Sequence, residues 1–350
     1  MVVIWEYKHY NLNESTVSYF NQLIATEQRY MMKSVSDKDK EMLKSNGLAS
    51  FLSKEQLHAN LAMVAVIIFW GISYVSIKVT VNEIPPITMG LIRFAIASLT
   101  LGIILHRVEP QTRLAKSDLP KMLLGGIFGI TIYFIFENIG VKLSSATNAS
   151  LIVSVVPIIT IILDALFFQS RISYMKLSGV IIAVLGSYLA VTGNGKAELN
   201  STHFHGNMLM IGAMISWALF TLVNKSLREK YSGLFLTTYQ TIFGTLCFIP
   251  FSLYEYKEWK LFSPMALGNI LFLAFFCSVG GYLLYTYALK RLDVALTTIY
   301  LNLIPVVGVL SGYLILKESV LPIQLIGGLI TLFAIVIVNF ELITLRHRRQ

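Results

Sequence analysis

Long apolar runs separated by short polar stretches dominate the chain from residue 58 onward. Ten of these runs are long enough to cross a bilayer, which takes about 20 residues of α-helix. They are continuous and do not alternate between apolar and polar positions, so we expect helices and not the strands of a membrane barrel. The predicted spans are 60–79, 87–105, 122–141, 146–168, 175–193, 206–226, 233–252, 267–289, 295–316 and 321–343.

Composition supports a membrane location. Of the 350 residues, 55% are hydrophobic and only 13% are charged, whereas soluble domains carry about 25% charged residues. A soluble protein this apolar would lack a polar surface, so we expect an all-α integral membrane protein. The two cysteines, Cys247 and Cys277, lie in apolar runs without CxxC spacing, which argues against redox chemistry.

Lysine and arginine are distributed unequally between the two sets of loops. The loops after the second, fourth, sixth and eighth spans and the end of the chain hold 13 of them, and the opposite loops hold five. The basic side is expected to be cytoplasmic. Both termini are then cytoplasmic: a polar tail at 1–57, where seven basic and seven acidic residues cancel, and a basic tail at 346–350. The net charge of +9 therefore indicates topology and not nucleic-acid binding.

Two similar stripes indicate an internal duplication. Each has the spacing i, i+4, i+8 on one helix face: Trp70, Tyr74 and Lys78 in the first span, and Trp217, Thr221 and Lys225 in the sixth. The stripes are offset by 147 residues, and Pro157 and Pro305 match at 148. Five spans is an odd number, so the second copy enters the membrane in the opposite orientation. We therefore expect two inverted five-helix repeats, at 58–198 and 199–345, as in many secondary transporters.

Several short motifs in this order resemble the EamA type of the drug/metabolite transporter superfamily, in its ten-helix form. They are Phe69-Trp70-Gly71, Pro85-Pro86 leading to Arg93-Phe94, the run 144–150 leading to Pro157, the run 295–305, Lys317-Glu318-Ser319 and Gly327-Gly328. The resemblance covers about residues 58–345 and implies metabolite transport driven by gradients, without a nucleotide site. The chain departs from the pattern where the glutamate after each fourth helix is expected: Glu318 is present, but the first half has Gln169-Ser170.

Arg93 and Glu137 are the charges whose predicted depths agree best. A buried arginine costs less free energy when it faces a carboxylate or a water-filled cavity, so we expect the two to pair or to line one cavity. The pair is either a static structural bridge or a functional site. In the second case Glu137 exchanges a proton during transport, or Arg93 holds an anionic group of the solute with its planar fork.

Further polar side chains are candidates for the walls of that cavity. Lys78, Tyr133 and Asn148 would line its outer half with Arg93 and Glu137, and Gln240, Lys225, Tyr285 and Asn302 would line its inner half. Each has a simpler alternative. The lysines could extend to the headgroups, the amides could form bonds between helices, and the tyrosines could belong to an interfacial belt.

Two further patterns concern packing and motion. Pro157 and Pro305 can kink the fourth and ninth helices and are candidate hinges. The GxxxG spacings Gly125/Gly129 and Gly308/Gly312 serve either packing within the chain or a homodimer.

The missing motifs narrow the function. The chain has no Walker-type phosphate loop, no HExxH sequence and no nucleophile elbow, so we expect no cofactor, no metal and no catalytic site. We predict a secondary transporter in the cell membrane that exports a small metabolite, such as an amino acid or an amphipathic solute, with the proton as a candidate coupling ion. The alternatives are an intramembrane enzyme, a non-transporting scaffold or receptor, and a passive channel.

Overall fold

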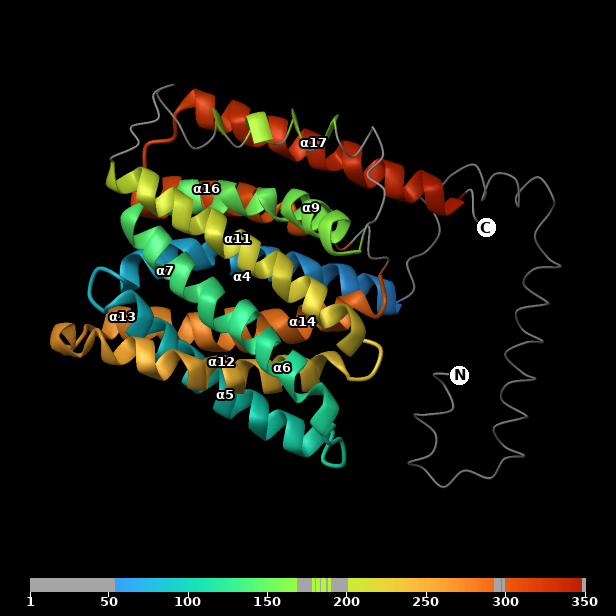
Figure 1. The fold of residues 1–350 in the computed structure, drawn as a ribbon. Helices are drawn as coiled ribbons and strands as arrows, with labels where there is room; N and C mark the ends of the chain where they lie inside the picture. Colours follow the sequence, from blue (N-terminus) through green and yellow to red (C-terminus); the bar gives the residue numbers. More distant parts are fainter. Residues whose placement is uncertain are drawn as a thin grey trace. The chain divides into compact units, whose positions relative to one another are not determined.

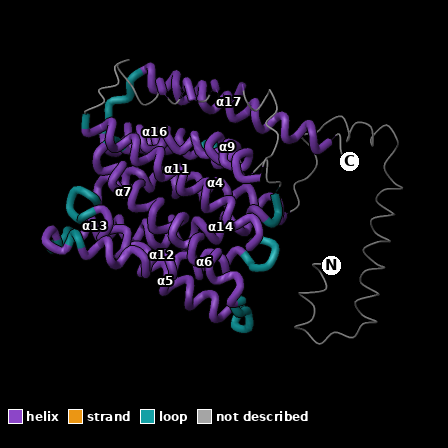
Figure 2. The backbone as a smooth tube through the Cα atoms, in the orientation of Figure 1, coloured by secondary structure: helices purple, strands orange, loops and turns teal. Residues whose placement is uncertain are grey.

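The computed structural model describes residues 54–168, 201–292, 297 and 300–347, together with scattered positions between 178 and 189. Throughout these ranges the backbone is helical or forms a short connection (Figure 2). Seven segments within them are long and apolar enough to cross a membrane. The chain is therefore an all-helical, multi-pass membrane protein, as predicted.

The long helices of Figure 1 follow the predicted spans closely. The first repeat contributes α4 (Lys54–Thr80), α5 (Pro86–Val108), α6 (Leu119–Gly126) continuing into α7 (Tyr133–Leu143), and α8 (Ala146–Ile152) continuing into α9 (Val156–Phe168). The second contributes α11 (Thr202–Leu227), α12 (Gly233–Leu253), α13 (Pro264–Leu271) continuing into α14 (Gly281–Leu289), α16 (Ile304–Leu316) and α17 (Pro322–His347). Most of the predicted fifth span, 175–193, and the tail at 1–53 lie outside the described residues.

The ninth predicted span, 295–316, is interrupted. Its described helix α16 has 13 residues, about 20 Å at the usual rise and too short to cross a bilayer alone. Pro305 is the second residue of α16, after a turn at 302–303. Pro157 is likewise the second residue of α9, directly after the 3₁₀ turn Val153–Val155. Both prolines thus start a new helical segment, where the missing N–H costs little; their use as hinges stays a prediction.

Contacts between α5 and α12 show that matched helices run in opposite directions. Three hydrogen bonds join α5 and its C-cap to α12 and its flanking residues: Thr88 with Glu255, Ser98 with Thr245, and Glu109 with Ser232. The residue numbers rise along α5 while those of the partners fall, so the two helices are antiparallel. The hydroxyls of Ser98 and Thr245 are 2.8 Å apart and 147 positions apart in sequence. A residue meets its own counterpart only close to a two-fold axis. An approximate two-fold axis therefore passes between α5 and α12, as an inverted repeat requires.

Both membrane-depth GxxxG pairs are used inside the bundle. A side chain at Gly125 would collide with Gln240, and one at Gly129 with Phe220. A side chain at Gly308 would collide with Ser150, and one at Gly312 with Thr147. These glycines bring the two repeats close together, so packing within the chain accounts for both spacings.

The third and eighth helices share a feature that the sequence did not reveal. Each contains a π-helical segment, Ile127–Ile132 before α7 and Phe272–Gly280 before α14. The two segments occupy matched places in the repeats, about 147 residues apart. The first ends directly before Tyr133, and the second contains Ser278 and ends two residues before Tyr282.

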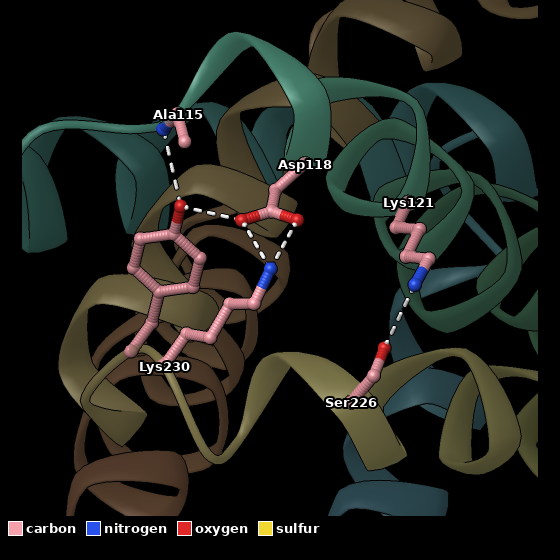
Figure 3. A network of polar contacts seen from close by, with 6 residues as sticks. Ala115, Asp118, Lys121, Ser226 and Lys230 are labelled. Carbon is pink, nitrogen blue, oxygen red and sulfur yellow. Dashed lines mark hydrogen bonds and ion pairs between the residues drawn. The ribbon is translucent and has the colours of Figure 1, made fainter.

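Polar contacts join the repeats at the predicted inner end, where the loop 109–118 meets the turn 228–232. Lys230 donates to both oxygens of Asp118, at 2.9 and 3.1 Å (Figure 3). The hydroxyl of Tyr231 donates to the same carboxylate at 3.0 Å and accepts from the backbone of Ala115 at 3.1 Å. These bonds raise the pKa of the Lys230 amine. The network ties α6 to the connection between α11 and α12.

At the predicted outer end, Glu83 holds the start of α13. Its carboxylate accepts the backbone N–H of Ser263 at 2.7 Å and the Ser263 hydroxyl at 2.8 Å. These bonds, the backbone bond first, lower the pKa of the Glu83 carboxyl from its ordinary value. A carboxyl with a lowered pKa stabilises the folded state above its unfolded pKa of about 4.3 and loses that contribution as pH falls through the folded value.

We therefore expect a Glu83→Gln variant to show a smaller fall in melting temperature between pH 6 and pH 3 than the parent protein. Thermal unfolding across that range measures it. An identical pH dependence in both proteins would show that this contact contributes nothing to stability.

Candidate functional site

Two charged side chains lie deep in the bundle. Arg93 on α5 and Glu137 on α7 are each only 3% exposed. Placing a charge at membrane depth costs about 2.5–3.5 kcal/mol by insertion scales, so such residues persist where partners or a function compensate. The contacts of each charge show how far the protein itself supplies that compensation.

The Arg93 guanidinium contacts three side chains, and one of its nitrogens has no partner among the described residues. Its Nε donates to the hydroxyl of Ser278 at 2.9 Å. The guanidinium carbon lies 4.5 Å from the ring centre of Phe134 and 4.9 Å from that of Phe94, at distances where the ring quadrupole attracts a cation. Its Nη1 is buried and has no hydrogen-bond partner in the described part of the chain.

Glu137 is held by two tyrosines. The Tyr133 hydroxyl, one turn earlier on α7, donates to its Oε1 at 2.9 Å. Tyr74, from the aromatic stripe on α4, interacts with this carboxylate electrostatically. Tyr74 and Tyr133 are both almost completely buried.

Arg93 and Glu137 attract each other electrostatically, but within the described ranges they form no direct ion pair. The salt bridge found there joins Lys230 and Asp118. A direct bridge between the two buried charges, one of the two arrangements that the sequence left open, is thus absent from this conformation. A cation and an anion stand near each other, each with its own partners.

An aromatic cluster from both repeats adjoins these charges. The two matched tryptophans meet at Tyr282 on α14, with ring centres 5.6 Å away for Trp70 and 6.5 Å away for Trp217. Trp70 also packs on Tyr285 at 5.7 Å, and Trp217 on Tyr133 at 5.2 Å. Tyr133 belongs to this cluster and also to the Glu137 contact. The charged site and the aromatic surface are therefore continuous.

Exposure changes along the bundle axis at this cluster. On the predicted outer side, residues 73–77 of α4 and 146–152 of α8 are all buried. On the predicted inner side, residues 282–287 of α14 are all partly exposed, including Tyr282 and Tyr285, which face Trp70. The helices are therefore packed more tightly around residues 73–77 and 146–152 than around residues 282–287.

Other predicted lining residues lie elsewhere. Lys78 donates to the backbone oxygens of Val141, Lys142 and Ser144 at the end of α7. Asn148 accepts the side-chain amide of Gln324 on α17 at 2.7 Å. Both residues join helices at the predicted outer end, away from the Arg93–Glu137 centre.

The predicted inner residues do not gather into one group. Gln240 donates to Asn224 at 2.6 Å and packs on Gly125. Lys225 is exposed near the end of α11, and Asn302 lies in the turn before α16. Tyr285 alone of this set reaches the aromatic cluster.

Sequence reasoning missed Ser278 as the partner of Arg93. A serine in an apolar run gives no local signal, and the two residues lie 185 positions apart. Tyr74, in contrast, was placed on the correct helix face by the i+4 spacing of its stripe. Among the described residues there is no group of three or more His, Cys, Asp or Glu side chains that could hold a metal.

A helical membrane bundle of two similar halves, with buried charges where they meet, is the architecture of a membrane transporter. The profile of the EamA-like transporter family matches residues 57–192 and again 204–340. The chain therefore belongs to that family, within the drug/metabolite transporter superfamily, and is a transporter and not an enzyme.

Individual proteins that are named as transporters, exporters or efflux pumps are also similar to this chain. An uncharacterized transporter of Archaeoglobus fulgidus is 32% identical, over 77% of this chain and 94% of the relative. A probable terminal-alkyne amino-acid exporter of Streptantibioticus cattleyicolor is 25% identical, over 83% and 95%. A probable amino-acid metabolite efflux pump of Salmonella typhimurium is 25% identical, over 76% and 89%. One crystal structure shares the fold, with a TM-score of 0.57 and 17% identity over 83% of this chain and 98% of the other.

Proposed function

We propose that this transporter exports a small zwitterionic metabolite, an amino acid or a close chemical relative, across the cell membrane by alternating access. One observation carries the proposal: Arg93 presents a buried, unpartnered nitrogen beside the equally buried Glu137. A site with one cation and one anion matches a solute that carries both charges. The names of two relatives, an amino-acid exporter and an amino-acid metabolite efflux pump, support the same class of solute.

The proposed binding roles follow from the contacts. Ser278 fixes one edge of the Arg93 guanidinium, so the free Nη1 donates to the solute carboxylate. Glu137 accepts the solute ammonium, or a proton when the solute is absent. The rings of Trp70, Trp217 and Tyr282 pack on the apolar part of the solute. Tyr133 and Tyr285 connect the charged and the aromatic surfaces.

Alternating access follows from two antiparallel halves around this site. Similar halves give an outward-open and an inward-open state of similar energy. The helix interruptions at Pro157 and Pro305 are the places where we expect the fourth and ninth helices to bend. With both termini cytoplasmic, a proton entering through Glu137 would drive the solute outward. A homodimer remains a separate prediction, and mass measurement in nanodiscs tests it.

Reconstitution tests the proposal. Proteoliposomes containing the purified protein are screened for uptake of radiolabelled amino acids, nucleosides and polyamines, with and without a pH gradient. We expect saturable uptake of at least one zwitterionic amino acid, and counterflow when unlabelled solute is trapped inside. Counterflow excludes a passive channel. Transport confined to polyamines or nucleosides would contradict a zwitterion site.

Glu137→Gln is expected to reduce uptake driven by a pH gradient to the level of empty liposomes. Glutamine keeps the size of the side chain and still accepts the Tyr133 hydrogen bond, but it carries no titratable proton. Counterflow at equal pH on both sides is expected to persist with a raised KM, because exchange needs no net proton movement but the solute ammonium has lost its carboxylate partner. Glu55→Gln, at the exposed start of α4, is the control. Full gradient-driven uptake in Glu137→Gln would end the coupling role.

A further inference from the structure

The corner between α7 and α8 is held by one charged side chain from each repeat. Lys78, on α4, donates to the backbone oxygens of Val141 at 2.9 Å, Lys142 at 3.0 Å and Ser144. A cation there balances the negative end of the α7 dipole. It also satisfies carbonyl groups that the end of a helix leaves without partners.

Glu318, in the second repeat, holds the other side of the corner. Its two carboxylate oxygens accept the backbone N–H groups of Ala146 and Thr147, each at 2.9 Å. An anion at the first turn of α8 satisfies free N–H groups and the positive end of the helix. Lys78 and Glu318 also attract each other electrostatically. The two side chains and the 141–147 corner form one connected unit, which we call the outer latch.

The backbone conformation just before Glu318 places its carboxylate at the start of α8. Lys317 ends α16 in the left-handed conformation with φ 56°, and among the described residues it is the one non-glycine with positive φ. The N–H of Glu318 then returns to the carbonyl of Gly312 at 3.2 Å. Such a conformation costs free energy for a residue with a side chain. Gly312 lets α16 approach α8, since a Cβ there would lie 2.6 Å from the Thr147 hydroxyl and 3.0 Å from Glu318.

We propose that the outer latch keeps the outer end of the transporter closed and thereby favours the inward-open state of the empty protein. It joins α4, the α7–α8 corner and the α16–α17 connection across the two repeats. Residues 146–152 directly beneath it are all buried. Opening the outer end must separate α16 from α8, which breaks the Glu318 bonds.

The latch has no acidic counterpart in the sequence of the other repeat. The positions that match Glu318 hold Gln169 and Ser170, which lie outside the described residues. The latch, and the bias that it gives to the closed outer end, therefore depends on a carboxylate that only one half supplies. An exporter needs this bias, because its empty site must face the cytoplasm to collect solute.

Thiol accessibility tests the latch without any solute. A Thr147→Cys reporter is introduced after Cys247 and Cys277 are changed to serine. Thr147 is 2% exposed and its hydroxyl has no partner in the described chain, so the reporter removes no bond. The protein is placed in nanodiscs, which give a water-soluble maleimide access to both faces. With the latch intact, we expect slow labelling.

Glu318→Gln should raise the labelling rate about tenfold, because charge-assisted bonds to both N–H groups are weakened. Lys78→Met, which acts from the other repeat, should raise it similarly, and the double variant should exceed either single variant only slightly. Glu258→Gln, the same change at an exposed glutamate between α12 and α13, should change nothing. Unchanged labelling in Glu318→Gln would overturn the proposal. If that variant does not fold, unchanged labelling in Lys78→Met does the same. Because no solute is used, this outcome is separate from the transport screen.

Discussion

Arg93→Lys is expected to lower the kcat/KM for transport of the best amino acid substrate by about 100-fold, since losing a buried, hydrogen-bonded charge contact costs 2–5 kcal/mol. Lysine keeps the positive charge but has a single ammonium group. It cannot donate to Ser278 through one nitrogen and present a second nitrogen to the solute in a fixed plane. It also loses the flat stacking on Phe134 and Phe94. Initial uptake rates over a range of solute concentrations measure the effect.

The control for this substitution is Arg107→Lys at the exposed end of α5, which should transport like the parent protein. Melting temperatures of both variants in detergent should stay close to that of the parent, because each retains a cation. A folded Arg93→Lys protein with normal kcat/KM would show that the guanidinium does not bind the solute.

Gly206→Ala is expected to destabilise the bundle by about 1–3 kcal/mol, the usual cost of overpacking. A Cβ at Gly206 on α11 would lie 2.7 Å from the backbone nitrogen of Ser144, 2.8 Å from the carbonyl oxygen of Gly140 and 2.9 Å from the carbonyl carbon of Leu143. All three are backbone atoms of α7 and its end, so no side-chain rotation relieves the collision. The two repeats would have to separate at the outer end. Thermal unfolding in a fixed detergent measures the loss.

Gly102 supplies the matched control for this prediction. It also lies in a membrane helix, α5, but a Cβ there meets nothing within 4 Å. Gly102→Ala should leave the melting temperature unchanged or raise it, because alanine favours a helix over glycine. Equal melting temperatures for the two alanine variants would contradict the close packing of α7 on α11.

The helices and the repeat could be predicted from the sequence because they follow from hydrophobicity and repetition. The apolar runs gave the helices, and the 147-residue offset gave the repeat that the Ser98–Thr245 contact reveals. The π-helical segments before Tyr133 and Tyr282 were not readable. Their sequences are as apolar as ordinary membrane helices, and only the packing of neighbouring helices decides where the extra residue is accommodated. The turn at 302–303 that shortens α16 is equally invisible in the sequence, because it lies within a continuous apolar run.

For the site, the sequence could predict only which residues share a face of one helix. The four-residue spacing of Tyr133 and Glu137 placed them on one face, and they are hydrogen-bonded. Contacts between helices depend on rotation about each helix axis, which sequence spacing does not specify. Arg93 therefore meets Ser278 instead of Glu137, and Lys78 caps α7 instead of facing the centre.

Reactivity of a cysteine at position 278 tests the central claim most directly, because this position contacts Arg93 where the repeats meet. In proteoliposomes containing Ser278→Cys, with Cys247 and Cys277 changed to serine, an impermeant thiol reagent is applied from one side and then, in separate vesicles, from the other. We expect faster reaction from the side that is cytoplasmic in the cell than from the opposite side, and protection by a saturating concentration of the transported solute. No reaction from either side, or reaction that the solute does not slow, would show that this centre is not the site through which the solute passes.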